Sequence, residues 1–564
     1  MSVAQATFAA TLVDEWVRAG VTDAVVCPGS RSTPLALALL RREELAVHVR
    51  LDERGAGFFA IGVAGATGRP VVVCVTSGTA AAELHPAVVE AHHARVPLIV
   101  CTADRPPELH DVGAPQTVEQ RGLYGVAVRW AADPGVPVEA TAWSWRSLGA
   151  RAVAEARSGP LGPGPVHLNL AFDEPLVADA GPLPEGRPAG APQHQVVVHA
   201  GAAEPWSWPA SDGVVVAGAG CGPAEGVLGL AEHLGWPVLA DPRSRCRVPN
   251  PHVVAAADAI ARRAPERLRP EVVVQLGASW ASKALPAYLA GAEMLAVDPW
   301  WRWEDPGRRV SVVHRAEPAA WLAAARALPP ARPSSGWLEG WQQAERAAQK
   351  VLDEQLGDAA LSEPLVARRV VRAVPAGALV VVSSSMPVRD LEWFAAPRAD
   401  PPKVLANRGA NGIDGVCSTA LGAAASGAGP VVALVGDLAF FHDLSSLVRG
   451  AGSPDAGSCT VVVVDNGGGG IFEFLPHRSL LDRSELEQLF ATPQAPDVVS
   501  AAQGLGLRTA DVGTPRELDD AVLAATRRAG VTIVRARVPS RQENVALHER
   551  LDAAVGEALA GIAM

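Results

Sequence analysis

Short, uninterrupted runs of apolar residues recur along the chain, and each is followed by a turn that contains glycine or polar residues. The runs at 431–435 and 461–464 are continuous rather than alternating, which is typical of strands buried on both faces of a sheet. Segments with helical spacing separate such runs, for example residues 7–19, which end at a glycine. Strands that alternate with helices in this way predict a doubly wound parallel sheet.

The same strand, loop and helix pattern occurs in blocks that are separated by segments rich in proline and glycine. Proline and glycine are frequent at residues 181–193 and 329–336, which we interpret as linkers. A chain of 564 residues is also too long for a single hydrophobic core. We therefore expect an α/β protein of three doubly wound parallel-sheet domains, at residues 1–180, 194–330 and 337–564.

Two of the apolar runs end at side chains that carry oxygen. Asp437 follows the run at 431–435, and Asn466 follows the run at 461–464. Both should lie at the same edge of a parallel sheet, where their oxygens suit a hard divalent ion that keeps room for phosphate oxygens. The glycines after Asn466 let the backbone approach closely. The stretch predicts a magnesium diphosphate site, although either motif alone is also typical of an ordinary turn at a strand end.

The N-terminal third contains a second candidate site. The loop PGSRSTPL joins a predicted strand to the start of a helix, where free backbone amides favour an anion, and it contains Arg31 and Ser32. Glu53 lies in the first turn of the next predicted helix. In isolation, a glutamate at that position is most simply a partner of the helix dipole.

Composition and charge exclude several classes of function. The net charge of -11 and the lack of a basic tract argue against general nucleic-acid binding. The seven cysteines include no C-x-x-C pair, so we expect reduced core residues rather than zinc ligands or disulfides. The N-terminal stretch lacks the basic start of a signal peptide, and no run of about 18 apolar residues occurs. We expect a cytoplasmic protein without a membrane span, whose partners are small molecules or protein.

Eight segments together resemble the thiamine diphosphate-dependent synthases of menaquinone biosynthesis. They are PGSRSTPL, LDERGAGFFA, TSGTAAAEL, TADRPPEL, GPVHLNLAF, SSSMPVRDLEWF, NRGANGIDG and GDLAFFHDL. The Gly-Asp pair and the later Asn also resemble the metal fingerprint of the wider thiamine diphosphate enzyme family. Five positions depart from the expected pattern: Leu438 and Asp465 in the fingerprint, and Glu83, Pro115 and Ala284 elsewhere.

The resemblance implies thiamine diphosphate and Mg2+ (or Mn2+) as cofactors. By the same resemblance, the metal ligands are Asp437 and Asn466 through their side chains and Gly468 through its carbonyl. Glu53 is implied as the catalytic carboxylate, which promotes the imino form of the cofactor's pyrimidine ring. The implied cofactor-binding residues are Glu53, Gly78, Ser384, Met386, Gly412, Ile413, Gly436, Asp437, Leu438, Asn466, Gly468 and Ile471.

The implied reaction is decarboxylation of 2-oxoglutarate and 1,4-addition of the resulting succinyl carbanion to isochorismate. Both substrates carry carboxylates, which guanidinium groups bind well. Ser385 and Arg389 would bind the distal carboxylate of 2-oxoglutarate, and Arg31 and Arg105 the acceptor. The implied substrate-binding residues are Arg31, Ser32, Arg105, Gln116, Lys283, Ser385, Arg389, Arg408 and Phe472.

The resemblance also implies a homodimer, or possibly a homotetramer, because members of the family build each active site from two subunits. Glu53 of one chain would face Asp437 of the partner subunit. Two alternatives stay open. An acetolactate-synthase-like carboligase or 2-oxo acid decarboxylase would share the cofactor site. It would not need four arginines together, namely Arg31, Arg105, Arg389 and Arg408. A non-catalytic binding protein on the same fold is disfavoured, because Glu53, Asp437 and Asn466 are all present.

Overall fold

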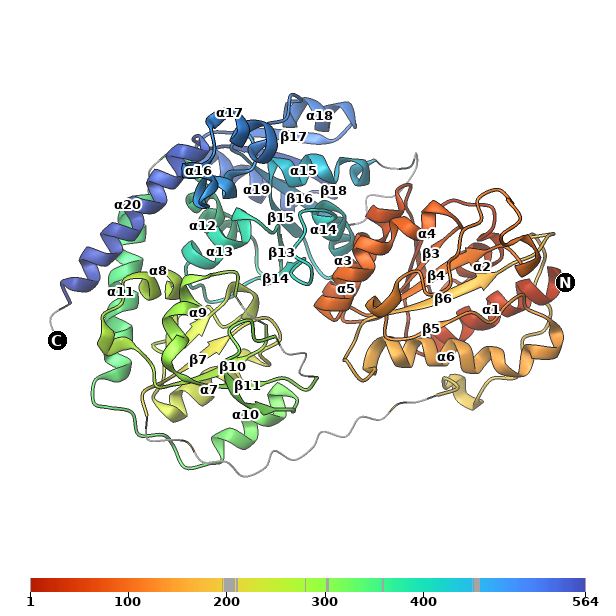
Figure 1. Ribbon diagram of the computed structural model, residues 1–564, viewed down its shortest axis with the longest axis horizontal. Coiled ribbons are helices and arrows are strands. Elements are labelled where there is room, and N and C mark those ends of the chain that lie inside the picture. Colours follow the sequence, from red (N-terminus) through yellow and green to blue (C-terminus); the bar gives the residue numbers. More distant parts are fainter. Residues whose placement is uncertain are drawn as a thin grey trace. The chain divides into compact units, whose positions relative to one another are not determined.

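The chain forms three six-stranded parallel sheets covered by helices, which confirms the predicted fold class (Figure 1). The computed structural model describes residues 2–194, 196, 208, 211–278, 280–300, 304–357, 360–448, 450 and 457–562. Internal contacts divide the chain into two compact units. Unit 1 comprises residues 1–198, 407–429 and 442–457, and unit 2 comprises residues 199–406, 430–441 and 458–564. Among the described residues, no helix combines the length and the hydropathy needed to cross a bilayer.

The sheet of unit 1 has the strand order β2-β1-β3-β4-β6-β5. Its strands are β1 (Asp23–Val26), β2 (Ala46–Val49), β3 (Val71–Val75), β4 (Leu98–Asp104), β5 (Ala131–Ala132) and β6 (Pro165–Ala171). Its α-helices are α1 (Ser2–Arg18), α2 (Thr33–Leu40), α3 (Glu53–Thr67), α4 (Thr79–Glu83), α5 (His85–Ala94) and α6 (Ala142–Ser158). Short 3₁₀ helices are η1 (Pro107–Leu109), η2 (Gly125–Ala127), η3 (Glu139–Thr141) and η4 (Pro188–Gly190). The strands β1, β3, β4 and β6 are buried throughout, which explains why most of their residues are apolar.

Unit 1 also contains α14 (Val416–Ala425) and η8 (Leu444–Leu447), which come from much later in the chain. Helix α14 packs against α3 at very close range. A Cβ atom added to Gly62 would lie 2.0 Å from the Thr419 carbonyl oxygen, and one added to Gly422 would lie 1.9 Å from the Phe59 carbonyl oxygen. The glycines therefore permit an approach of the two backbones that no larger residue allows.

The central sheet, in unit 2, has the order β12-β11-β10-β7-β8-β9. Its strands are β7 (Gly213–Ala217), β8 (Val238–Ala240), β9 (Val253–Val254), β10 (Val272–Leu276), β11 (Glu293–Val297) and β12 (Val310–His314). The accompanying helices are α7 (Ala224–Leu234), η5 (Pro242–Ser244), α8 (Ala257–Arg263), η6 (Glu266–Leu268), α9 (Ala284–Tyr288), η7 (Leu289–Gly291) and α10 (Pro318–Arg326).

The third sheet, also in unit 2, has the order β14-β13-β15-β16-β18-β17. Its strands are β13 (Leu379–Val382), β14 (Lys403–Ala406), β15 (Val431–Gly436), β16 (Ser458–Asp465), β17 (Arg508–Val512) and β18 (Gly530–Arg537). The helices are α11 (Trp337–Leu356), α12 (Glu363–Ala373), α13 (Met386–Phe394), α15 (Asp437–His442), η9 (Gly470–Phe474), α16 (His477–Leu480), α17 (Arg483–Leu486), η10 (Glu487–Ala491), α18 (Val498–Gly504), α19 (Pro515–Thr526) and α20 (Arg541–Ala560). The two apolar runs used for the prediction lie within β15 and β16.

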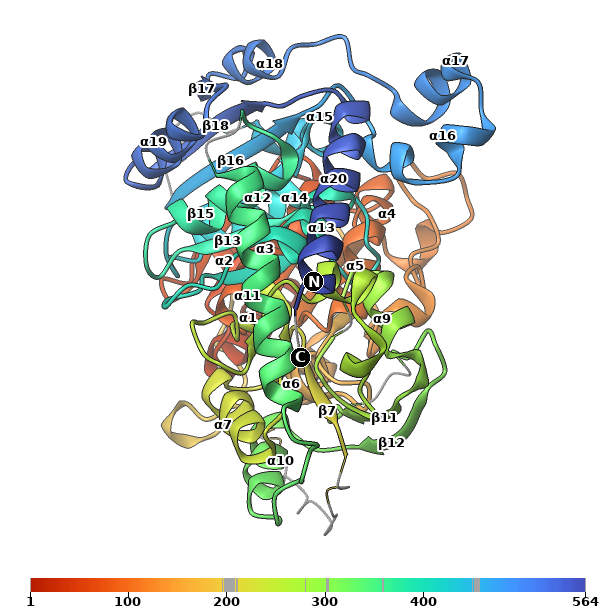
Figure 2. The same ribbon diagram turned by 90° about the vertical axis from the view of Figure 1, so that its left-hand side faces the viewer.

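Helices α11 and α20 lie side by side in unit 2 (Figure 2). Both contribute to the same apolar core as the central sheet, for example through Leu352 and Val555. The ring of Trp341 in α11 lies 6.3 Å from the ring of Tyr288 in α9. Helices α11 and α20 thus belong to the core of the central sheet, whereas β13, β15, β16 and β18 contribute to a separate apolar cluster.

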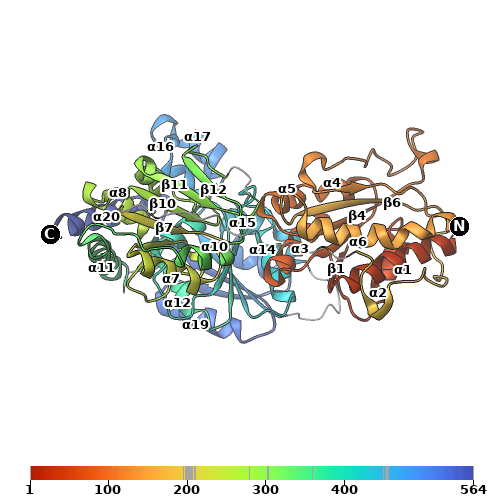
Figure 3. The same cartoon turned by 90° about the horizontal axis from the view of Figure 1, so that it is seen from below.

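Helices α1 and α6 lie side by side in unit 1 (Figure 3). Their side chains form a buried ion cluster. The Nη1 atom of Arg146 donates to Asp14 at 2.7 Å and to Glu15 at 2.6 Å. Burial alone would raise the pKa of Asp14, but hydrogen bonds from Arg146 and Arg18 outweigh it and hold this pKa below its usual value. The cluster satisfies acids that would otherwise be buried without a counter-charge.

We predict that Arg146→Met destabilises unit 1, because the substitution removes the cation that Asp14 and Glu15 share. Asp14 keeps ion pairs with Arg18 and Arg42, so the cost falls mainly on the buried Glu15. Breaking such a buried pair costs about 3–5 kcal/mol. Urea unfolding followed by circular dichroism measures the change. The stability due to the lowered pKa of Asp14 is present above the unfolded pKa and is lost as the pH falls through the folded one. The difference between wild type and variant should therefore be largest near neutral pH and shrink on acidification.

Arg41→Ala is the matched control, since Arg41 pairs with Asp179 at 3.4 Å on the exposed surface of the same unit. It should change the free energy of unfolding by less than about 1 kcal/mol. Equal effects of the two substitutions would contradict the structural role assigned to Arg146.

Candidate active site

Asp437 and Asn466 lie at the ends of neighbouring strands of unit 2. Strands β15 and β16 are parallel and adjacent, with Gly436 opposite Val464. Asp437 directly follows β15, and Asn466 directly follows β16. The amide of Gly468 donates to Asp437 Oδ2 at 2.7 Å, so the two loops are also joined directly. The structure thus brings the predicted side-chain ligands to one edge of the sheet.

The carboxyl group of Asp437 is buried, which raises its affinity for protons. Burial raises its pKa to about 6, against the opposing effect of hydrogen bonds from the Leu438 and Gly468 amides. The amide of Leu438 donates to Asp437 Oδ1 at 2.7 Å, so both carboxylate oxygens are held in place by backbone groups. A bound cation would stabilise this carboxylate in its charged form.

Asn466 presents an oxygen that lacks a hydrogen-bond donor. Its Nδ2 atom donates to Glu363 Oε1 at 2.8 Å, whereas its Oδ1 atom is buried and has no hydrogen-bond partner among the described residues. A buried amide oxygen without a partner is costly unless something else binds it. Together with the carboxylate of Asp437, it forms the kind of oxygen donor set that fits a hard divalent ion.

The loop after Asn466 depends on glycine. Gly468 has a φ angle of +127°, and a Cβ atom added there would lie 2.2 Å from the Ala491 carbonyl oxygen. The Gly468 carbonyl, the third predicted ligand, accepts from the Gly470 amide at 2.8 Å. Ile471 and Phe472 follow in η9, where the Phe472 ring contacts the ring of Phe490 at 5.3 Å.

The start of α13 lies at the same edge, because β13 is the other neighbour of β15. Ser384 and Met386 are buried there, and Ser385, between them, has a left-handed φ angle of +72°. The guanidinium of Arg389 donates to the Ser385 carbonyl oxygen, so it folds back over the start of its own helix. Burial lowers the pKa of Arg389. An anion at this position would be stabilised by the guanidinium and by the helix N-terminus.

Lys283 lies at the N-terminus of α9 and its side chain is exposed. The segment before it is tied to α13, because the amides of Ala281 and Ser282 donate to Glu392 at 2.7 and 3.0 Å. Glu392 thereby fixes the backbone next to Lys283 within unit 2.

Four strands of unit 1 bring a second group of predicted residues to one sheet edge. Arg31 follows β1, Glu53 follows β2, Gly78 follows β3 and Arg105 follows β4, and these strands are neighbours in the sheet. Ser32 directly precedes α2, and its hydroxyl donates to the Gly29 carbonyl at 3.1 Å instead of accepting from a helix amide. The carboxyl ends of a parallel sheet are where α/β proteins bind ligands.

Glu53 is the first residue of α3. Asp52 caps this helix by accepting from the Gly55 amide at 3.0 Å, so Glu53 is not needed as a cap. Burial raises the pKa of Glu53, and the nearby charges of Asp52 and Glu83 raise it further. The carboxyl group therefore keeps its proton to a higher pH than an ordinary glutamate, which suits proton exchange with a heterocycle.

Arg31 and Arg105 both contact groups within unit 1. Arg31 Nη1 donates to the Phe172 carbonyl at 2.9 Å, and Nη2 lies 3.4 Å from a carboxylate oxygen of Glu174. The guanidinium of Arg105 donates to the Ser77 hydroxyl. Burial lowers the pKa of Arg105, and the neighbouring charge of Arg31 lowers it further. Two guanidinium groups that repel one another in this way attract an anion.

Gln116 and Gly78 lie together at the end of β3. Gln116 Nε2 donates to the Ser77 carbonyl at 2.9 Å, and the Gly78 amide donates to Gln120 Oε1 at 2.9 Å. Gln120 is fully buried and was not identified from the sequence, where an isolated glutamine in a loop carries no signal. Its role is to hold the backbone of this predicted cofactor loop.

A second residue that the sequence did not reveal is Glu90 in α5. Its two carboxylate oxygens accept from the amides of Gly409 and Ala410 at 2.8 and 2.7 Å. These amides belong to the loop that contains Arg408, Gly412 and Ile413. A cavity of about 320 Å³ adjoins the loop and is lined in part by Gly412 and Glu90. A glutamate on a helix that also contains three histidines carries little signal in the sequence, and its partners lie more than 300 residues away.

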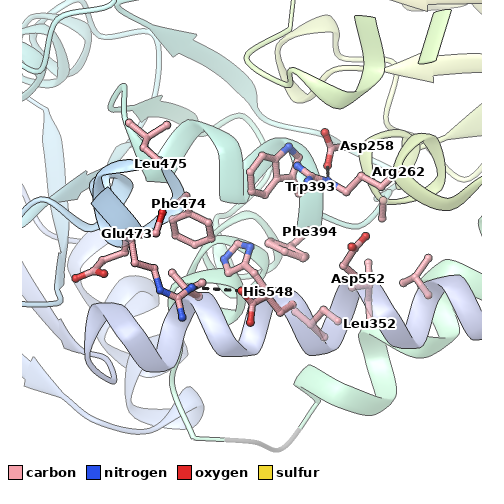
Figure 4. A pocket seen from close by; sticks show the side chains of 17 residues that line it. Asp258, Arg262, Leu352, Trp393, Phe394, Glu473, Phe474, Leu475, His548 and Asp552 are labelled. Atoms are coloured by element: carbon pink, nitrogen blue, oxygen red, sulfur yellow. Dashed lines mark hydrogen bonds and ion pairs between the residues drawn. The ribbon is translucent and has the colours of Figure 1, made fainter. Parts of the chain in front are cut away.

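A larger cavity of about 510 Å³ in unit 2 lies away from the predicted residues, none of which lines it. His548 projects into it from α20, among the rings of Trp393, Phe394 and Phe474 (Figure 4). Burial lowers the pKa of His548 to about 4, so this ring is neutral near pH 7. Its Nε2 atom lies 3.3 Å from Asp390.

Three family models match successive parts of the chain. They are the N-terminal TPP binding domain of thiamine pyrophosphate enzymes at residues 6–123, the middle domain of thiamine pyrophosphate at 189–381, and the C-terminal TPP binding domain of thiamine pyrophosphate enzymes at 392–536. A solved structure of benzoylformate decarboxylase from Polynucleobacter necessarius superposes with a TM-score of 0.71 at 18% identity, covering 95% of this chain and 98% of that one. The structural likeness supports the fold.

Curated relatives resemble the chain over nearly its whole length. Each of three is named 2-succinyl-5-enolpyruvyl-6-hydroxy-3-cyclohexene-1-carboxylate synthase. The relative from Bacillus velezensis is 38% identical over 97% of both chains. That from Chloroflexus aurantiacus is 41% identical over 96% of this chain and 94% of its own, and that from Thermobifida fusca is 42% identical over 97% and 99%. The chain therefore belongs to the thiamine pyrophosphate enzymes and, within them, to the family of the 2-succinyl-5-enolpyruvyl-6-hydroxy-3-cyclohexene-1-carboxylate synthases.

Proposed function

We propose that this enzyme decarboxylates 2-oxoglutarate and adds the remaining four-carbon unit to isochorismate, with thiamine diphosphate and Mg2+ (or Mn2+). The products would be 2-succinyl-5-enolpyruvyl-6-hydroxy-3-cyclohexene-1-carboxylate and CO2, in menaquinone biosynthesis. The observation that carries the proposal is the sheet edge of unit 2, where Asp437 and Asn466 follow adjacent strands. There the side-chain oxygen of Asn466 is buried and has no hydrogen-bond partner within the described part of the chain. The names of the relatives support the choice of reaction.

Asp437, Asn466 and Gly468 would hold the divalent ion, which in turn would bind the diphosphate of the cofactor. Carboxylate, amide and carbonyl oxygens suit this role. When bound, thiamine diphosphate supplies the nucleophilic carbon and the electron sink for decarboxylation. Gly78, Ser384, Met386, Gly412, Ile413, Gly436, Leu438 and Ile471 would complete the cofactor site.

Glu53 would hold a proton against a ring nitrogen of the cofactor. Its raised pKa, caused first by burial, supports this role, because proton transfer is efficient when the two groups have similar affinities for the proton. We propose a homodimer in which Glu53 of one chain serves the metal site held by Asp437 of the partner subunit. A cytoplasmic location fits the small-molecule substrates.

Substrate carboxylates would bind at two places. The distal carboxylate of 2-oxoglutarate would lie between Ser385 and Arg389, where a guanidinium and a helix N-terminus are available. Isochorismate would contact Arg31 and Arg105. Ser32, Gln116, Lys283, Arg408 and Phe472 would complete the substrate contacts.

The proposed function is tested by the consumption of isochorismate. With the purified chain, consumption should require both 2-oxoglutarate and thiamine diphosphate and should cease when the divalent metal is chelated. Pyruvate is the matched control, because it lacks the distal carboxylate. Equal turnover with pyruvate would favour an acetolactate-synthase-like enzyme or a simple decarboxylase instead. Failure to bind the cofactor at all would favour a non-catalytic protein.

We predict that Glu53→Gln retains cofactor binding and loses turnover, because the amide keeps the shape but cannot exchange the proton. Turnover should fall at least about 100-fold, in line with the usual contribution of general acid-base catalysis. Calorimetry reports cofactor binding, and NMR reports proton exchange at the thiazolium carbon. The exposed Glu44→Gln is the control, which should change neither readout. An unchanged exchange rate in Glu53→Gln would refute the assigned role.

We predict that Arg31→Ala and Arg105→Ala separate the two halves of the reaction. Loss of a charge-assisted hydrogen bond to the acceptor should weaken isochorismate use by about 10-fold or more. Decarboxylation of 2-oxoglutarate, measured with an artificial electron acceptor, should be largely retained. Arg41→Ala, on the exposed surface of the same unit, should change neither activity. Parallel loss of both activities would instead place these arginines in the cofactor site or in the fold.

A further inference from the structure

A buried glutamate contacts Asn466 at the edge of the third sheet, in unit 2. Glu363 is the first residue of α12, and only 3% of its surface is exposed. Its Oε1 atom accepts from Asn466 Nδ2 at 2.8 Å, across 103 residues of sequence. Among the described residues, Asn466 is the only hydrogen-bond partner of this side chain.

The usual reasons for an acid at a helix start do not account for Glu363. The cap of α12 is supplied by Ser362, whose side chain accepts from the Leu365 amide. A carboxylate that merely complements the helix dipole can remain in water, whereas the side chain of Glu363 is buried. The contact with Asn466 therefore accounts for the burial of the Glu363 side chain.

An asparagine amide has a donor end and an acceptor end, and the two point in opposite directions. Glu363 offers an oxygen acceptor, which is a carboxylate oxygen when the group is charged and a carbonyl oxygen when it is neutral. The donor end of Asn466 therefore faces Glu363, and Oδ1 faces away from it, buried and without a hydrogen-bond partner in the described part of the chain. Only that oxygen can bind a cation, because the amide nitrogen has no free lone pair.

We propose that Glu363 is a positioning residue that holds the Asn466 amide with Oδ1 turned toward the divalent ion. This inference rests on the metal site of the proposed function. Substitution of a residue that orients a metal ligand typically lowers the metal affinity about 10- to 100-fold. Glu363 would act only through Asn466, without touching the metal, the cofactor or a substrate.

The test is the affinity for Mn2+ in the presence of thiamine diphosphate, followed by the electron paramagnetic resonance signal of free Mn2+. Glu363→Met keeps a similar volume but removes the acceptor, so the dissociation constant should rise about 10- to 100-fold. Glu363→Gln keeps a carbonyl acceptor and should stay within about threefold of wild type. Circular dichroism verifies folding, and Glu363→Ala replaces the methionine variant if methionine is not accommodated.

A second background separates orientation from general damage to the fold. In Asn466→Asp, the carboxylate offers an oxygen on both sides and has no donor end to orient. Adding Glu363→Met to that background should therefore not weaken Mn2+ binding as it does in the wild-type background, because no amide remains to be held. An equal loss in both backgrounds, or Mn2+ binding by Glu363→Met that matches wild type, would overturn the inference.

Asp437→Ala distinguishes this failure from failure of the proposed function. If wild type binds Mn2+ and Asp437→Ala does not, the metal site stands and the Glu363 variants decide the positioning role. If Asp437→Ala binds Mn2+ as tightly as wild type, the metal site itself is wrong and the role of Glu363 falls with it.

Discussion

The parallel pairing of β15 with β16 is the constraint on which the candidate site depends. The register that places Gly436 opposite Val464 also places Asp437 and Asn466 at the same edge of the sheet. Since the side chains of adjacent strand ends are held by the strands themselves, little further ordering is needed when a ligand binds. The glycine-rich loop after β16 then closes on Asp437 through the amide of Gly468.

In each unit, buried polar side chains that do not themselves belong to the implied cofactor set hold candidate loops or side chains in place. Glu90 holds the loop of Gly409, Gln120 holds the backbone at Gly78, and Glu363 holds the amide of Asn466. Each of these groups is buried and hydrogen-bonded to a segment distant in sequence. Burial of a polar group is stabilising only when its partners are in place, so these contacts fix the loops in a single arrangement.

The sequence predicts those features that depend on local order. The helix expected at residues 7–19 is found as α1 (Ser2–Arg18), because its apolar residues recur at helical spacing and face the core. The strand ends that place Asp437 and Asn466 are predictable for the same reason. The contact of Glu363 with Asn466 is not, because it depends on how α12 packs, and a glutamate after a serine looks like an ordinary helix start. The contact of Arg31 with the Phe172 carbonyl likewise joins residues that lie 141 positions apart in the chain.

The central claim is that a divalent ion binds between Asp437 and Asn466. The most direct measurement is a crystal structure of the chain grown with thiamine diphosphate and Mn2+, with anomalous diffraction data collected at the manganese edge. The account predicts an anomalous peak about 2.1 Å from an Asp437 carboxylate oxygen and from Asn466 Oδ1, with the cofactor diphosphate beside it. A cofactor-bound structure whose manganese peak lies more than about 4 Å from both side chains, beyond any coordination distance, would contradict it.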